Sequence, residues 1–395
     1  MPKKIVPTQH YIEDEIRTVA YACSDLTEWY AKNKREFPWR DDTSPYKVWI
    51  SEVMLQQTRI ETVLPYYRRF MAELPTIRSL AEVDEQRLLK LWEGLGYYSR
   101  AKNLKRTAMI LVRDYDGFLP PSFEELRQLP GIGDYTAGAI ASIAFHIPVP
   151  AVDGNVMRVL SRLLASFDDV MLPSVRKRMA ELLRDVYPGG EEAGLLTEAL
   201  MELGETICIP GSKPKCRACP VREECEAHKQ HIQGKLPIRK NALPRKVEEK
   251  TVLLLHYEIR YALTRQENGL LDGMWCLPML NGNLDEKSVE EELAKIGIGV
   301  RELTPLCKAK HLFSHVEWHM TGFYVECANR SERYMWETAE GIRELYAVPA
   351  AYRKYLKVLM QHEDQMPPSQ FDIRKIPIDR IDARYHGQIL KKTVK

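Results

Sequence analysis

The sequence predicts a mainly helical protein that ends in a smaller domain built from strands and a helix. From Glu13 to about Val186, apolar residues recur at helical spacing in segments separated by prolines. Past Lys250 the pattern changes to β-branched and aromatic runs, TVLLLHYEIRYALT and HVEWHMTGFYVEC, with the helical segment SVEEELAKI between them. The length of 395 residues favours more than one core, because domains average about 150 residues.

The composition restricts the classes of partner. The formal net charge is only +2, so a nucleic-acid role has to rest on local basic stretches. No run of about eighteen apolar residues occurs, and MPKKIVPTQHY lacks the apolar core of a secretory signal, so we expect a soluble, intracellular protein with no membrane span. One basic stretch, residues 227–247, contains no acidic residue and suits an extended linker, either solvated or crossing a phosphate backbone.

A carboxylate lies on an apolar helical face in PYKVWISEVMLQQTRIETV. Pro45 suits the first turn of a helix behind the candidate cap Ser44, and Glu52 falls three or four residues from Val48 and Leu55. Desolvation on that face would raise the pKa of Glu52 toward neutrality, as a general acid requires. The spacing alone is equally compatible with a surface or salt-bridged glutamate.

The segment WEGLGYYSRAKNLKR places a glycine turn, residues 94–96, before Tyr97 and Tyr98. Four basic residues follow: Arg100, Lys102, Lys105 and Arg106. Aromatic residues beside basic ones suit a wedge that enters a base stack between backbone contacts. An ordinary helix with a solvated basic face explains the composition as well.

A glycine-turn hairpin, LPGIGDYTAG, begins at Leu129. Pro130 closes one helix, and we expect positive φ angles at both Gly131 and Gly133, which would leave the first N–H groups of the next helix free to bind a phosphate. Tyr135 falls on the first turn of that helix. A tyrosine cannot form a Schiff base with a sugar.

Asp153 directly precedes a further helix, NVMRVLSRLL. Its position makes it a natural N-cap. We expect a carboxylate held there to stay ionised, the state that can stabilise a developing sugar cation. A carboxyl pair in opposite protonation states, Glu52 neutral and Asp153 charged, would suit removal of a base from a sugar, much as in glycoside hydrolysis.

Four of the eight cysteines crowd into eighteen residues. Cys208, Cys216, Cys219 and Cys225 form a C-x7-C-x2-C-x5-C pattern, which indicates a metal site in a reducing compartment and not a disulfide framework. The compact spacing favours a four-iron cluster over tetrahedral zinc, the competing occupant. Basic residues lie within or beside the loops, so the metal can simply hold a surface for phosphates.

Three histidines recur every fourth residue in the second domain and imitate a metal-binding helix face. They are His311, His315 and His319. The surroundings are strand-like, and a strand would align the three side chains only if it ran uninterrupted through Ser314, so we do not expect a metal there.

Taken together, SEVMLQQT, GLGYYSR, LPGIGDYTAG, VDGNVMRVLSR and the cysteine quartet resemble the MutY family of adenine DNA glycosylases, in the helix-hairpin-helix superfamily with endonuclease III. The resemblance implies a glycosylase domain over residues 1–229, a basic linker over 230–248 and an α+β Nudix-like domain over 249–362. The glutamate box of Nudix hydrolases is missing from SVEEELAKIGI, so this domain would recognise and not hydrolyse. The tail, residues 363–395, lies beyond the resemblance and has no assigned fold.

The family's chemistry is excision of adenine mispaired with 8-oxoguanine or guanine, by flipping the adenine out of the duplex. By resemblance, Glu52 is the acid that protonates the adenine ring nitrogen N7, and Asp153 stabilises the oxocarbenium-like sugar, either electrostatically or through a transient covalent bond. Tyr135 and Asn155 orient Asp153, and Gly131 and Gly133 hold the DNA phosphate. The remaining matches contact the bases: Arg40, Leu55 and Glu198 line the adenine pocket, Gln57, Thr58 and Tyr97 enter the stack, and Phe313, Ser314 and His315 read the oxidised guanine.

The resemblance also implies a [4Fe-4S] cluster on the four cysteines, double-stranded DNA as partner, and a monomeric enzyme of the bacterial cytoplasm and nucleoid. Bifunctional relatives carry a lysine where this chain has Tyr135, so the enzyme is expected to leave the strand intact. The first cysteine gap is seven residues where the family usually has six. Two alternatives remain: a glycosylase for thymine or an oxidised pyrimidine, which the FSH loop disfavours, and a non-catalytic mismatch sensor or redox protein, which the two carboxylates disfavour.

Overall fold

The computed structural model describes residues 9–240, 244–267 and 269–364. The described residues form two compact units: those within 1–245 together with Leu345–Ala347, and those within 246–344 together with those from 348 onward. The tail predicted over residues 363–395 lies outside the described residues from position 365 onward, and helix α16 (Arg353–Asp364) continues into its first two positions. No helix in the described ranges is both long and apolar enough to cross a membrane.

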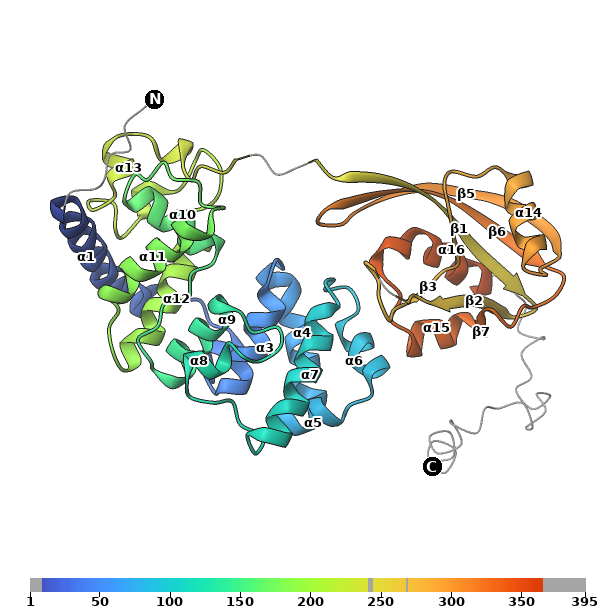
Figure 1. Cartoon of the computed structure of the whole chain (residues 1–395), viewed down its shortest axis with the longest axis horizontal. Coiled ribbons are helices and arrows are strands. Elements are labelled where there is room, and N and C mark those ends of the chain that lie inside the picture. The colour runs from blue at the N-terminus through green and yellow to red at the C-terminus, as the bar shows by residue number, and fades with distance from the viewer. Residues whose placement is uncertain (1–8, 241–243, 268, 365–395) are drawn as a thin grey trace. The chain divides into compact units, whose positions relative to one another are not determined.

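The first unit is helical throughout, as its apolar periodicity predicted (Figure 1). One group of helices comprises α2 (Pro38–Asp41), α3 (Pro45–Leu55), α4 (Ile60–Glu73), α5 (Ile77–Glu82), α6 (Glu85–Trp92), α7 (Ser99–Asp114), α8 (Phe123–Leu126) and α9 (Asp134–Ala139), which continues as the π-helix η1 (Ile140–Ala144). The other comprises α1 (Gln9–Asn33), α10 (Gly154–Leu163), α11 (Pro173–Asp185), α12 (Glu191–Thr206) and α13 (Glu226–Lys229).

The core of the second group forms where α1, α10, α11 and α12 pack together. Their apolar side chains recur every three or four residues and are fully buried, as Leu26, Leu160, Leu183 and Leu200 illustrate. Burial of such a side chain stabilises the fold by roughly 1.5–3 kcal/mol, so this core sets α10 and α12 firmly in place. Both helices carry residues of the site described below.

The segment 230–240 differs from the extended linker that the sequence predicts. It contains the 3-10 turn η3 (Gln233–Lys235), Leu236 is buried, and Asp169 forms a parallel bridge with Ile238. Composition could not reveal this, because the packing depends on single apolar residues, Leu236 and Ile238, among many basic and polar ones. The segment therefore belongs to the body of the helical unit.

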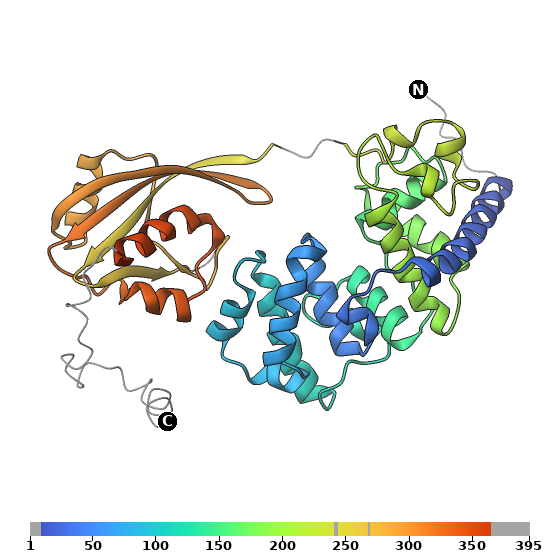
Figure 2. The ribbon, with the colours of Figure 1, turned by 180° about the vertical axis from the view of Figure 1, so that it is seen from behind.

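The second unit is a mixed sheet with helices on its faces (Figure 2). Its strands are β1 (Lys246–Tyr257), β2 (Arg260–Arg265), β3 (Trp275–Cys276), β4 (Met279–Asn281), β5 (Val300–Leu312), β6 (Val316–Cys327) and β7 (Met335–Glu337). The order is β3-β2-β1-β6-β5, with β4 on β1 and β7 on β2, and only β1 and β6 pair in parallel.

Helices cover the sheet because its central strands are apolar on both faces. The helix α14 (Glu286–Lys295), which the sequence predicts, buries Val289 and Leu293 against Leu253 and Val325. Tyr355 of α16 packs against Gly322 of β6, where a Cβ atom would lie 2.3 Å from the ring. The remaining helices are α15 (Ala339–Leu345) and the short turn η4 (Ala350–Tyr352).

Candidate active site

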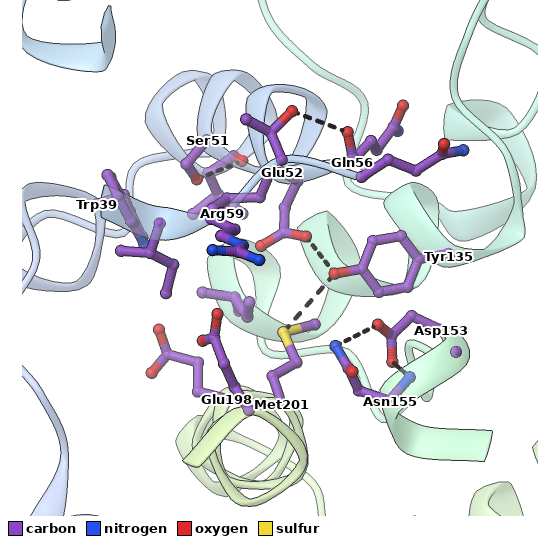
Figure 3. Close-up of a pocket in the computed structure, with 18 of the residues that line it drawn as sticks. Trp39, Ser51, Glu52, Gln56, Arg59, Tyr135, Asp153, Asn155, Glu198 and Met201 are labelled. Carbon is purple, nitrogen blue, oxygen red and sulfur yellow. Dashed lines mark hydrogen bonds between the residues drawn. The ribbon is translucent and has the colours of Figure 1, made fainter. Parts of the chain in front are cut away.

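A cavity of about 600 Å³ opens in the helical unit and is lined from α3, α9, α10 and α12. Figure 3 shows Glu52 and Tyr135 facing each other across it, with Asp153 and Asn155 beside them and Glu198 on α12. Nine sequence-predicted residues line this one cavity: Arg40, Glu52, Leu55, Gln57, Thr58, Tyr135, Asp153, Asn155 and Glu198. Residues about 150 positions apart in the chain thus meet at one place.

Glu52 is buried on α3, with only 5% of its surface exposed. Its neighbours on that helix are apolar, and its carboxylate accepts one hydrogen bond, from the Tyr135 hydroxyl at 2.6 Å. Burial raises the pKa of Glu52 to about 7, against the lowering effect of the Tyr135 hydrogen bond; the charges of Asp153 and Glu198 raise the pKa further. At neutral pH, Glu52 can therefore hold and release a proton.

Asp153 caps α10. Its Oδ1 accepts hydrogen bonds from the backbone N–H groups of Asn155 at 2.8 Å and Val156 at 2.7 Å, and its Oδ2 accepts one from the Asn155 side chain at 2.9 Å. Burial raises the pKa of Asp153, while the backbone hydrogen bonds and Arg158 lower it. The capping hydrogen bonds favour the ionised carboxylate that the sequence predicts, and burial acts against them.

Arg40 and Glu198 lie among further charges that the sequence analysis did not identify. Arg40 Nη2 contacts Glu202 Oε2 at 2.8 Å, and its Nε lies 3.8 Å from Glu198 Oε1. Glu202 is 2% exposed and also pairs with Arg35. The Tyr30 hydroxyl donates to Glu198 at 3.1 Å, yet burial raises the pKa of Glu198. Arg40 and Glu198 thus line the cavity, and Glu202 and the Arg35 carbonyl hold Arg40 in place there.

The glycine turn before α7 does expose an aromatic residue. Gly94 and Gly96 have φ angles of 103° and 73°, and Tyr97 is 47% exposed. Arg100, however, is buried and donates to backbone carbonyls, including those of Val53 at 2.7 Å and Leu95 at 3.1 Å, so the expected solvated or DNA-facing role is wrong for it. Lys105 likewise donates to the carbonyls of Ala81 and Val83.

The glycine hairpin joins α8 to α9. Gly131 has the expected positive φ, 76°, and its missing Cβ lets it approach Asn103. Gly133 does not: its φ is −89°, because it forms the extended N-cap of α9. Ser44, the candidate cap of α3, also makes no side-chain capping hydrogen bond. The hairpin forms as predicted, but with one left-handed glycine and not two.

Comparison with known proteins identifies the family to which the chain belongs. Residues 50–186 match the HhH-GPD superfamily of base excision DNA repair proteins, and residues 251–358 match the NUDIX domain family. An adenine DNA glycosylase of Buchnera aphidicola subsp. Acyrthosiphon pisum is 33% identical over 317 residues, which are 79% of this chain and 89% of that protein. The chain belongs to the adenine DNA glycosylase family.

A mammalian relative of the glycosylase matches over a shorter part of the chain. The Rattus norvegicus adenine DNA glycosylase is 41% identical over 244 residues, 60% of this chain and 46% of the rat protein. Among solved structures, a thermostable thymine-DNA glycosylase has a TM-score of 0.48 and 27% identity, and the match covers 54% of this chain and 98% of that one. The predicted fold class and enzyme class are confirmed: the chain is a base excision repair enzyme that removes adenine, with a helix-hairpin-helix domain and a Nudix-like domain.

The four cysteines of the glycosylase gather around one cavity after α12. Cys208, Cys216, Cys219 and Cys225 line it together with apolar side chains of α10 and α12. Burial raises the pKa of Cys219 to about 12 and that of Cys225 to about 11. Within the described ranges, no three His, Cys, Asp or Glu side chains lie close enough to hold a metal ion.

The FSH sequence lies in the Nudix-like unit, at the turn between β5 and β6. The Phe313 N–H donates to the Val316 carbonyl at 2.8 Å, which closes the hairpin, and the Phe313 ring packs edge-on against Trp318 with centroids 4.8 Å apart. Ser314 and His315 are exposed at its tip. The hairpin also separates His311 on β5 from His319 on β6, so the three histidines do not share one continuous strand.

Some cavity residues were missed by sequence reasoning. They include Trp39, Gln56, Met201, Glu205 and Arg239. Glu205 had one usable signal, because it falls seven residues after Glu198 and so shares a face of α12 with it. Arg239 had none, since its approach to the cavity depends on how the segment before it packs.

Proposed function

We propose that the glycosylase excises adenine mispaired with 8-oxoguanine or guanine, with Glu52 as general acid and Asp153 as the group that stabilises the sugar cation. The observation that carries this proposal is the buried Glu52, whose pKa of about 7 lets it hold a proton in a cavity it shares with Asp153. A cavity of about 600 Å³ has room for a flipped base, and such sites take the base out of the duplex before reacting with it.

In this mechanism, the Glu52 carboxyl transfers its proton to N7 of the flipped adenine. The bond between sugar C1′ and base N9 then breaks, and its electron pair leaves with the neutral base. The sugar becomes an oxocarbenium-like cation, which the nearby Asp153 carboxylate stabilises until water adds to C1′ and releases a proton. Positioned acid catalysis of this kind contributes on the order of a hundredfold to ten-thousandfold.

Two features support a monofunctional enzyme that recognises adenine. Tyr135 donates its hydroxyl to Glu52 and cannot form a Schiff base, so no lyase step is expected at that position. Arg40 and Glu198 present a donor and an acceptor in the same wall of the cavity, a pair that suits the edge of a purine. Glu202 holds Arg40 in that wall.

Recognition of the oxidised base is assigned to the hairpin of the second unit. Ser314 and His315 are exposed at a tip that the packed Phe313 ring supports, so a base edge can reach both side chains. We expect Ser314→Ala to weaken discrimination between A:8-oxoguanine and A:G while leaving A:G excision unchanged. Unaltered discrimination would contradict this assignment.

The cysteine quartet suits a [4Fe-4S] cluster, since four thiols line one largely apolar cavity and each iron of such a cluster takes one thiolate. The cluster would hold the loop that carries Lys213, Lys215 and Arg217 in one conformation. We expect a brown purified protein with about four irons per chain, as the cluster's formula requires. A colourless, zinc-containing protein would overturn this assignment.

The main test is base release under single-turnover conditions, compared across A:8-oxoguanine, A:G and T:G duplexes. We expect release from the first two and none from T:G, with intact strands until alkali is added. Glu52→Gln should bind the A:8-oxoguanine duplex as the native enzyme does but fail to release adenine. Unchanged release by this variant would exclude Glu52 as the acid.

A further inference from the structure

The active-site cavity includes one arginine from the segment that the sequence predicts as a linker. Arg239 lies two residues beyond Pro237, and the backbone before it is fixed to the helical unit at two points. Arg162 Nε donates to the Leu236 carbonyl at 3.1 Å, and the Val170 N–H donates to the Ile238 carbonyl at 3.1 Å. Leu236 itself is 3% exposed. Arg239 is therefore placed by the fold, and not by a flexible tether.

The side chain of Arg239 lies next to the residue that follows Asp153. A Cβ atom built on Gly154, the first residue of α10, would lie 3.7 Å from Arg239 Nη2. Arg239 and Asp153 both line the cavity, and Arg239 also reaches solvent. The guanidinium thus stands at the side of the cavity where the Asp153 carboxylate would meet the sugar.

Two other arginines of the cavity are already engaged. Arg158 donates to the Cys208 and Gly204 carbonyls at 2.8 and 2.7 Å and to the Asn155 side chain at 2.9 Å. Arg40 is paired with Glu202. Among the described residues, the side chains of Arg239 and Arg59 form no hydrogen bond or ion pair. Arg59 occupies the N-cap position of α4, whereas Arg239 lies beside the first residue of α10. Of the arginines that line the cavity, Arg239 is therefore the one beside the first residue of α10 whose side-chain donors are not engaged within the described part of the chain.

A nucleotide whose sugar faces Asp153 brings its phosphates close to a carboxylate, and these like charges repel. The N-terminus of α10 offers little compensation, because Asp153 already takes the N–H groups of Asn155 and Val156. An arginine fork matches phosphate geometry and neutralises one charge. We propose that Arg239 binds a backbone phosphate adjoining the flipped nucleotide; this rests on the proposed function, which puts the sugar against Asp153.

The test measures binding of the full chain to an A:8-oxoguanine duplex, in the Glu52→Gln background so that no base is released. Adding Arg239→Ala should weaken binding about tenfold and reduce the slope of log affinity against log salt by about one. Arg239→Lys should keep the slope and lose part of the affinity. Arg184→Ala, an exposed arginine of α11 outside the cavity, serves as the control and should change neither quantity.

Duplexes with a single neutral methylphosphonate on either side of the target adenosine locate the contact. One of these two should weaken binding of the Arg239-containing protein by about as much as Arg239→Ala does, and should have no further effect on that variant. Additive losses at both positions, or an unchanged salt slope, would overturn the proposal. If the native enzyme releases adenine while these results fail, only the Arg239 assignment falls; if it releases none, the proposed function falls, and this assignment with it.

Discussion

Glu52 and Asp153 are two buried carboxylates in one cavity, and they differ mainly in the donors around them. Glu52 lies within a helix, where every backbone N–H of its turn is used, and it accepts a single hydrogen bond. Asp153 lies one position before a helix and accepts two backbone hydrogen bonds and one from Asn155. Burial raises the pKa of both groups, and it raises that of Glu52 to about 7.

The difference shows how one cavity can hold both an acid and an anion. Desolvation acts on the two groups alike, so position relative to a helix decides which one keeps its proton. A carboxylate in the middle of a helix finds no free backbone N–H groups nearby. A carboxylate at the N-cap lies beside the unpaired N–H groups of the first turn and can accept hydrogen bonds from them. We therefore expect that neutralising either carboxylate slows adenine release. Neutralising Glu52 should also change how the stability of the protein depends on pH.

After the loss of adenine release expected for Glu52→Gln, the largest expected effect is that of Asp153→Asn on the rate. An amide still accepts the backbone hydrogen bonds of Asn155 and Val156, but it has no charge to offer the sugar cation. Single-turnover release of adenine should fall by about a hundredfold to thousandfold, the usual loss for one electrostatic group aimed at a transition state. Thermal unfolding should change little.

Asp153→Ala provides the matched control, because it removes the cap as well as the charge. It should lose about 1 kcal/mol of stability beyond Asp153→Asn, with a similar rate. A rate for Asp153→Asn close to that of the native enzyme would show that the capping hydrogen bonds, and not the charge, are what the reaction uses.

Sequence analysis could predict this comparison only in part. The apolar spacing around Glu52 and the helix start after Asp153 are local patterns. They predicted that Glu52 lies on an apolar helical face and that Asp153 caps a helix, as the structure shows. The burial of Asp153, which raises its pKa, could not be predicted in this way because it depends on α9 and α12, which are distant in sequence. The solvated or DNA-facing role predicted for Arg100 was wrong for a similar reason. Its neighbours in sequence are basic, but its hydrogen-bond partners lie in α3 and the glycine turn.

The next effect concerns stability. Because the folded state raises the Glu52 pKa from 4.5 to about 7, this group's contribution is fully present below about pH 4.5 and is lost as pH rises through 7. The loss amounts to about 3 kcal/mol by pH 8. The free energy of unfolding of Glu52→Gln, measured with urea, should therefore increase relative to that of the native protein as the pH rises from 4.5 to 8.

An exposed glutamate gives the control for this measurement. Glu181→Gln, on the solvent side of α11, should follow the native pH dependence. A difference between Glu52→Gln and the native protein that stays constant with pH would mean that Glu52 ionises in the folded state at its ordinary pKa, and the acid role would lose its physical basis.

The smallest effect tests the single hydrogen bond that Glu52 does accept. The Tyr135 hydroxyl lowers the Glu52 pKa, since it stabilises the ionised carboxylate. Tyr135→Phe should therefore raise it, and the fall in single-turnover rate above neutrality should move to higher pH by about one unit, because a hydrogen bond to a charged group contributes about 1.5 kcal/mol.

Tyr30→Phe is the matched control for Tyr135→Phe, because the Tyr30 hydroxyl donates to Glu198 and not to Glu52. It should leave the midpoint of the pH profile in place, even if the rate falls through weaker recognition of the base. A midpoint that moves equally in both variants would mean that the profile reports the shared charge of the cavity. A shift to lower pH in Tyr135→Phe would mean that the tyrosine favours the protonated acid, and the contrast between the two carboxylates would then rest on burial alone.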